Sequence, residues 1–302
     1  MREVTLAAIQ MESTRNKREN LQKALDFIDI ATSRGAQAVL LPEAWLSGTA
    51  ERTRDHEEFL KYTVAFDDEF TTALSASAKK NGILLVAGGL YERDSDGYLY
   101  NTVPIFQPDG TLLSKVRKTH LENAPVKAET DHMVSPGEPD FDVFDTSIGK
   151  IGVIVDIDIC ALEIARIMSL KGVEIIFWPL SWTSDAHDCI DIYGRAAATI
   201  SDGFVVAASH YGELRYYTLD HFLGGSGIID LRSYVARVPD CQEGVAVATV
   251  DLDKVAKRRE MIREIYPYWR RPEDYKLLID AEAEKAVRGG RYDLSGKIAK
   301  HL

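Results

Sequence analysis

Residues 151–182 have the sequence IGVIVDIDICALEIARIMSLKGVEIIFWPLSW and show the pattern of the fold more clearly than other parts of the chain. Residues 151–155 form a short apolar run in which most side chains are β-branched, and this pattern predicts a buried strand. Residues 161–170 carry apolar side chains at helical spacing and stop before Gly172, which predicts a helix. Residues 173–178 predict a second buried strand. Strands that alternate with helices in this way indicate an α/β fold.

Asp156 lies at the turn between the first strand and the helix, where a strand-to-helix elbow exposes a nucleophile. The alternative interpretation is an aspartate that only forms the turn. We expect Asp158 to be the N-cap of the helix, because its side chain can accept hydrogen bonds from the free amides of the first turn. Cys160, one turn into the helix, is expected to be a packed core cysteine and not a nucleophile.

The same alternation continues on both sides of this stretch. It predicts strands at residues 4–9, 38–41, 83–89, 204–209 and 245–250, helices at 20–33 and 70–81, and a hairpin of residues 98–107 and 112–118 around Pro108-Asp109-Gly110. The total of about ten strands and roughly four helices exceeds what one open sheet usually holds. We therefore expect two sheets, with antiparallel members, packed face to face with helices outside.

Composition limits the class of protein. The 302 residues are 45% hydrophobic, which is enough for a core without disulfides or metal. The absence of a linker predicts one domain, residues 1–275, followed by a charged C-terminal arm, residues 276–302. A net charge of -11 argues against nucleic acid, and no run of roughly 20 apolar residues predicts a membrane span. Three cysteines without metal-ligand spacing, and no signal peptide, predict a cytoplasmic protein without a metal or cofactor.

Two further polar residues follow or close predicted strands. Glu43 comes just after strand 38–41, at the carboxyl edge where α/β folds bind ligands, and is a candidate base. Lys118 closes the strand 112–118, where its ammonium would stabilise an oxyanion or hold a carboxylate in its charged form. The alternatives are a surface turn for Glu43 and an exposed basic strand for Lys118.

Together, in this order, these segments resemble the carbon-nitrogen hydrolase (nitrilase) superfamily, whose members carry a Glu-Lys-Cys triad on a four-layer α-β-β-α sandwich. LLPEAWLSG looks like the glutamate segment, VRKTHL the lysine segment, and residues 151–182 the cysteine elbow with the next helix and strand. Fitted without a gap, the elbow places Asp156 at the cysteine position, while Asp158, Glu163 and Arg166 match. Glu129 resembles a second active-site glutamate; taken alone it would be a solvated loop residue.

The resemblance implies a site of Glu43, Lys118, Glu129 and Asp156, with Glu43 as base, Lys118 as oxyanion donor and Glu129 as positioning group. A carboxylate is a weaker nucleophile than a thiolate and would pass through a reactive anhydride. Asp156 would therefore orient or deprotonate a water, or attack a more electrophilic centre. Three carboxylates around one ammonium predict either one carboxyl with a raised pKa or a cationic group on the ligand.

We therefore expect an enzyme that acts on a non-peptide C-N bond of a small molecule, with Asp156 at the nucleophile position. The alternative is a small-molecule-binding or regulatory homologue without activity. The family's Arg-Ala-x-Glu-Asn segment is altered, with Ala197, Ile200 and Ser201 at the expected positions, so the family's usual pocket is not assured. This alteration, and Ile157 in place of tyrosine, favour natural divergence over an introduced Asp156. A homodimer or larger homo-oligomer is expected by the same resemblance.

Overall fold

The computed structural model describes residues 1–48, 50, 53, 55–122, 129–213, 221–265, 270–280 and 283. Two sheets account for most of its strands. The first sheet has seven strands, with β6 (Leu112–Arg117) paired to β5 beside the main order, which is β15 (Gly244–Asp251), β1 (Glu3–Gln10), β2 (Ala38–Leu40), β3 (Leu84–Val86), β5 (Leu99–Phe106) and β4 (Leu90–Arg93).

The second sheet has six strands and contains both strands that were predicted within residues 151–182. Its parallel centre is formed by three strands whose carboxyl ends meet at one edge. The order is β14 (Tyr234–Arg237), β13 (Gly227–Ile229), β10 (Phe204–Ala208), β9 (Ile175–Pro179), β8 (Gly149–Val153) and β7 (Val143–Thr146). A separate hairpin pairs β11 (Tyr211–Glu213) with β12 (His221–Leu223).

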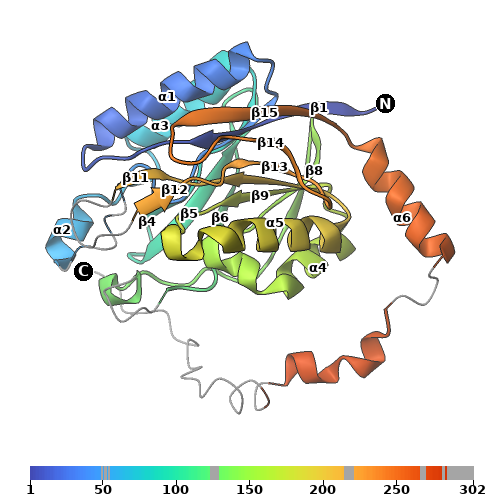
Figure 1. Ribbon diagram of the computed structural model, residues 1–302. Helices are drawn as coiled ribbons and strands as arrows, with labels where there is room; N and C mark the ends of the chain where they lie inside the picture. The colour runs from blue at the N-terminus through green and yellow to red at the C-terminus, as the bar shows by residue number, and fades with distance from the viewer. Residues whose placement is uncertain are drawn as a thin grey trace.

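Helices cover the outer face of each sheet (Figure 1). The long helices α1 (Lys17–Ser33) and α3 (Glu69–Asn81) pack on the first sheet, and α4 (Leu162–Leu170) and α5 (His187–Ser201) pack on the second. Two further helices, α2 (His56–Leu60) and α6 (Asp253–Ile265), lie at the periphery. The predicted α-β-β-α sandwich of two mixed sheets is confirmed.

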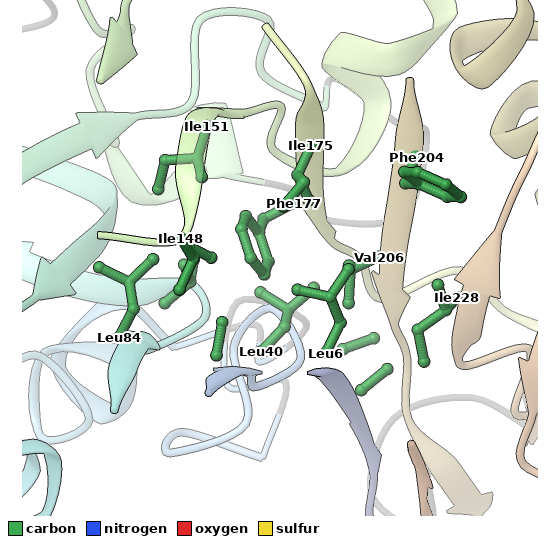
Figure 2. Close-up of a cluster of buried hydrophobic side chains, with 14 of the residues drawn as sticks. Leu6, Leu40, Leu84, Ile148, Ile151, Ile175, Phe177, Phe204, Val206 and Ile228 are labelled. Carbon is green, nitrogen blue, oxygen red and sulfur yellow. The ribbon is translucent and has the colours of Figure 1, made fainter. Parts of the chain in front are cut away.

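The main core lies between the two sheets (Figure 2). Alternation along β1 explains the layering: Leu6 points into the space between the sheets, while Ile9 packs with the helices outside. From the second sheet, Ile175 and Phe177 of β9 fill the same space, and both are fully buried. Each such side chain contributes about 1.5–3 kcal/mol through burial, so this layer holds the two sheets together.

Most predicted elements are confirmed within a few residues, including the antiparallel β5-β6 hairpin. The described ranges contain fifteen strands and six α-helices, more than the ten and four expected. The additional strands β4, β7 and β11 to β14 are only three or four residues long, too short to show a periodic pattern.

The C-terminal arm expected at residues 276–302 lies largely outside the described residues. Its described beginning is exposed, as are the preceding residues from Arg271 on. In the part of the chain that the structure describes, no helix has the length and apolar character to cross a membrane.

Candidate active site

Asp156 stands at the elbow between β8 and α4. Val153 ends β8, and Asp156–Cys160 form one 3-10 turn before α4 begins at Leu162. The backbone of Asp156 has φ of +49°, in the left-handed region that side chains other than glycine rarely adopt and that aspartate tolerates better than most. Its carbonyl accepts a hydrogen bond from the indole N–H of Trp178 at 3.0 Å. The predicted strand-to-helix elbow is confirmed.

Glu43 follows β2 and is held by close backbone packing. The next residue, Ala44, donates its N–H to the carbonyl of Gly89 at 2.8 Å. A Cβ on Gly89 would lie 2.7 Å from Oδ1 of Asn101 and 2.8 Å from Cγ of Glu43. Position 89 therefore has to be glycine for the Glu43 side chain to keep its place.

The ammonium of Lys118 joins the four predicted site residues. Its Nζ lies 3.1 Å from Oε1 of Glu43, 2.9 Å from Oε2 of Glu129 and 2.7 Å from Oδ2 of Asp156. All four residues are buried, with exposed fractions between 1% and 3%. The alternative interpretations of Lys118 as an exposed strand residue and of Glu129 as a solvated loop residue are therefore wrong. We call these four residues the charged cluster.

Two uncharged side chains add hydrogen bonds to the charged cluster. Nδ2 of Asn101, on β5, donates to Glu43 at 2.7 Å and to Glu129 at 2.8 Å. Oγ of Ser181, two residues beyond β9, donates to Oε2 of Glu43 at 2.7 Å. The sequence analysis missed both. A polar residue inside the buried strand 98–107 was the available signal for Asn101, and the end of a buried strand was the signal for Ser181.

The pKa values of Glu43 and Asp156 are shifted in opposite directions within the charged cluster. Burial raises the pKa of Glu43 well above its ordinary value, and the nearby charge of Asp156 adds to the effect. Burial alone would also raise the pKa of Asp156, but the charge and hydrogen bond of Lys118 outweigh it, so that this pKa is lowered. For Lys118, burial is outweighed by the three carboxylates, and its pKa is raised well above the ordinary range. The expectation that one carboxyl has a raised pKa thus agrees with Glu43.

Asp158 is not the N-cap of the following helix, which corrects the prediction. Its carboxylate accepts the backbone N–H groups of Thr119 at 3.0 Å and of His120 at 2.7 Å. Ala161 precedes α4 instead and makes no side-chain cap. Thr119 and His120 follow the end of β6, so their N–H groups have no acceptor on a neighbouring strand. The carboxylate of Asp158 accepts both and thereby joins the elbow to the segment after β6.

Cys160 is exposed, so its prediction as a packed core cysteine is wrong. The 3-10 turn displaces it from the face of α4, whose buried side chains are Ile164, Ala165 and Met168. Cys160, Cys189 and Cys241 are all free thiols. Among the described residues, no group of three or more His, Cys, Asp or Glu side chains has the arrangement to hold a metal ion.

The altered segment at Ala197, Ile200 and Ser201 lies in the last turns of α5. Ala197 is part of the core between α5 and the second sheet, and Ile200 packs against it. The hydroxyl of Ser201 accepts the N–H of Gly203 at 3.3 Å and helps to end the helix. In the described structure these three residues serve packing and helix termination.

Comparison with known proteins identifies the family of the chain. The profile of the carbon-nitrogen hydrolase family matches residues 5–260. The chain belongs to the carbon-nitrogen hydrolase family. Omega-amidase NIT2 of Xenopus tropicalis is 34% identical over 271 residues, which cover 87% of this carbon-nitrogen hydrolase and 94% of the relative.

Two solved structures illustrate the fold of this carbon-nitrogen hydrolase. Nit3 of Saccharomyces cerevisiae, from branch 10 of the nitrilase superfamily, is 28% identical with a TM-score of 0.75, covering 90% of this chain and 97% of Nit3. A glutamate-to-glutamine mutant of an amidase from Nesterenkonia sp. AN1, with acrylamide added to its active-site cysteine, is 20% identical with a TM-score of 0.69, covering 87% of this chain and 99% of the amidase. Family and relatives support an amidase- or nitrilase-like hydrolase, as expected from the sequence.

Proposed function

We propose that this carbon-nitrogen hydrolase cleaves a non-peptide C-N bond of a small molecule at the charged cluster, with Asp156 in the position that a cysteine nucleophile holds in related enzymes. The observation that carries the proposal is the convergence of Glu43, Glu129 and Asp156 on the buried ammonium of Lys118. A desolvated cluster of this kind costs stability, and such clusters are concentrated at functional sites.

Asp156 contributes a fixed negative charge and not a covalent bond to the substrate. Its ion pair with Lys118, at 2.7 Å, and its lowered pKa keep it ionised and weakly basic. Attack by this carboxylate on an amide carbon would form an anhydride, a higher-energy acyl intermediate than a thioester. The role we propose for Asp156 is to hold Lys118 and to orient the attacking oxygen.

Glu43 is the base that we propose for this oxygen. Its raised pKa brings proton uptake closer to neutral pH, where a general base is most effective. Glu129 and Asn101 act as positioning groups, since Asn101 joins the two glutamates through one amide nitrogen. These assignments keep the roles that the family resemblance implies for Glu43 and Glu129.

The substrate that we propose is a small molecule with a terminal amide. The support comes from the relatives, which are omega-amidases. A cationic group on the substrate would add to its binding, because the cluster sets three carboxyl groups against one ammonium. The proposed setting is a cytoplasmic homo-oligomer built from the domain of residues 1–275 and its C-terminal arm.

One observation favours a second candidate, a binding homologue without turnover. A lysine ammonium has three N–H donors, and Lys118 has three carboxylates within hydrogen-bond distance. The expected oxyanion role of Lys118 therefore requires one of these contacts to open when the substrate binds. A protein in which all three persist would bind a small molecule and leave its C-N bond intact.

Activity measurements on a panel of small terminal amides separate the two candidates. For the hydrolase we expect ammonia release by the wild type, a loss of at least about tenfold in Asp156→Asn, and a comparable loss in Glu43→Gln. For the binding homologue, calorimetry would detect an amide that binds without being cleaved, and Asp156→Cys would gain ammonia release. Unchanged turnover in Asp156→Asn would refute a catalytic role of the carboxylate.

A further inference from the structure

Ser181 occupies an unusual position beside the charged cluster. It follows β9, at the carboxyl edge where the elbow after β8 also lies. Its Oγ is 2.7 Å from Oε2 of Glu43, and its backbone N–H donates to Oδ1 of Asp156 at 3.3 Å. Glu43 and Asp156 are buried, whereas Ser181 is partly exposed. Ser181 therefore lies between the buried cluster and the solvent side.

We propose that Ser181 is the nucleophile of this hydrolase and forms a covalent acyl ester with its substrate. The inference deepens the proposed function and rests on it. Two observations carry it: the hydroxyl is already hydrogen-bonded to a buried carboxylate, and the nucleophile position at the elbow holds a group that is committed to Lys118.

The pairing of Ser181 with Glu43 has the geometry of an activated nucleophile. A serine hydroxyl is weakly nucleophilic until a base within about 2.6–3.2 Å accepts its proton, and 2.7 Å lies inside that range. The Glu43 carboxyl has a raised pKa and is thus a stronger base than an ordinary glutamate. An alkoxide that attacks an amide carbon forms an ester, which water can cleave without an anhydride.

The reaction balances with groups that lie at the site. As Oγ of Ser181 bonds to the amide carbon, its proton passes to the carboxylate of Glu43. When the C-N bond breaks, that proton passes to the leaving nitrogen, so that ammonia departs and the acyl ester remains. A water then gives a proton to Glu43 as its oxygen bonds to the ester carbon. Glu43 returns the proton to Oγ as the ester bond breaks.

Asp156 has a defined part in this scheme without gaining or losing a proton. Its Oδ1 accepts the backbone N–H of Ser181, and its Oδ2 pairs with Lys118. One carboxylate thus fixes both the nucleophile's backbone and the cluster's cation. An aspartate in place of a cysteine at position 156 would remove the thiolate nucleophile, while its carboxylate would position Ser181 as the nucleophile.

The opposing interpretation is that Ser181 only orients Glu43. The test uses p-nitrophenyl acetate as acyl donor, the wild type, Ser181→Ala and Ser181→Cys. Ser209→Ala is the matched control, because Ser209 follows the neighbouring strand β10 and its buried hydroxyl has no hydrogen-bond partner among the described residues. Intact-mass and peptide mass spectrometry locate the acetyl group, and thermal unfolding checks that each variant folds.

We expect acetylation of Ser181 in the wild type and in Ser209→Ala, none at this position in Ser181→Ala, and an acetyl thioester in Ser181→Cys. With an amide substrate, turnover should fall at least about 100-fold in Ser181→Ala and recover in part in Ser181→Cys. Loss of turnover without an acyl group at position 181 and without recovery by cysteine would leave Ser181 a positioning residue and overturn the inference.

Two outcomes separate this inference from the proposed function. Amide turnover that is undiminished in Ser181→Ala overturns the nucleophile and keeps the hydrolase. Acetylation of Ser181 in a protein that cleaves no amide keeps the nucleophile and overturns the amidase activity.

Discussion

Nδ1 of His120 lies 2.7 Å from Oδ1 of Asp158, and Nζ of Lys118 lies the same distance from Oδ2 of Asp156. His120 lies two positions after Lys118, and Asp158 lies two positions after Asp156. The segment after β6 and the elbow after β8 are therefore joined by two neighbouring side-chain contacts. The inner pair is buried in the cluster, and the outer pair fixes the backbone that carries it.

We predict that Asp158→Ala loosens the Lys118 segment. The substitution leaves the partly buried N–H groups of Thr119 and His120 without their acceptor, which costs at most about 1–3 kcal/mol for each amide. His120→Ala keeps both backbone contacts and should cost less. Urea unfolding of the two variants measures the difference, and an equal loss of stability in both would contradict the account.

A pH dependence follows from the same pair. The hydrogen bond with Asp158 raises the pKa of His120. Because the pKa of His120 is higher in the folded state, its protonated form stabilises the fold. This contribution is complete below the pKa of the unfolded state, about 6.5, and is lost as pH rises through the pKa of the folded state. The stability difference between the wild type and His120→Ala should therefore be largest in mild acid and shrink above about pH 6.5. A difference that grows with pH would be inconsistent with the contact.

Removing the ammonium of Lys118 should be among the costliest single changes in this protein. Lys118→Met leaves three buried carboxyl groups without their cation, and losing one partner of a buried ion pair costs about 3–5 kcal/mol. Adding Asp156→Asn to this variant should restore part of the loss. Lys80→Met, which breaks an exposed pair with Asp29, is the control and should cost at most about 1 kcal/mol. Additive effects of Lys118→Met and Asp156→Asn in chemical unfolding would contradict this coupling.

The rate of amide hydrolysis should report the raised pKa of Glu43. Glu43 acts as a base only after it has lost its proton, so kcat/KM should rise with pH through a value above the ordinary glutamate pKa of 4.5. Asp156, whose pKa is lowered, stays ionised over that whole range and adds no second acid limb above pH 3.8. In Glu43→Gln the residual rate should lose this acid limb. A limb that remains in Glu43→Gln would assign the titration to another group.

Gly89→Ala should impair activity while leaving the fold in place. The new Cβ would collide with Asn101 and Glu43, and displacement of a catalytic base by about 1 Å can lower turnover about 100-fold. Gly82→Ala is the matched control, since its Cβ meets nothing within 4 Å and its φ of +63° predicts only a loss of stability, roughly 1–2 kcal/mol. Equal activity in the two variants, measured with the same amide, would show that the close packing at Gly89 is irrelevant to turnover.

The sequence was informative where one strand determines where a side chain lies. Glu43 and Asp156 each follow a short apolar run, and the end of such a strand places a residue at the sheet edge whatever the rest of the chain does. Lys118 and Glu129 needed the family resemblance, because a basic strand end and a loop glutamate look like surface features when taken alone. The burial of Lys118 and Glu129 depends on how the two sheets pack together, which no single segment of the sequence shows.

Contacts between distant segments explain the errors. Asp158 has the composition of an N-cap, but its acceptor oxygens are used by amides 38 and 39 residues earlier in the chain. Cys160 follows the helical spacing, yet the 3-10 turn keeps it out of α4. Asn101 and Ser181 carry no charge, and a polar residue in or after a buried strand does not by itself indicate a site. Their hydrogen bonds identify them: Asn101 contacts Glu43 and Glu129, and Ser181 contacts Glu43.

The positive φ of Asp156 limits which side chains suit the elbow. Asparagine and glycine tolerate this backbone conformation, whereas valine, isoleucine and threonine crowd it. In a saturation library at position 156, many variants would therefore lose activity because they fold poorly, and not because they lack the carboxylate. Soluble variants lacking activity are informative about the carboxylate only when they come from the small set of residues that the left-handed backbone accepts.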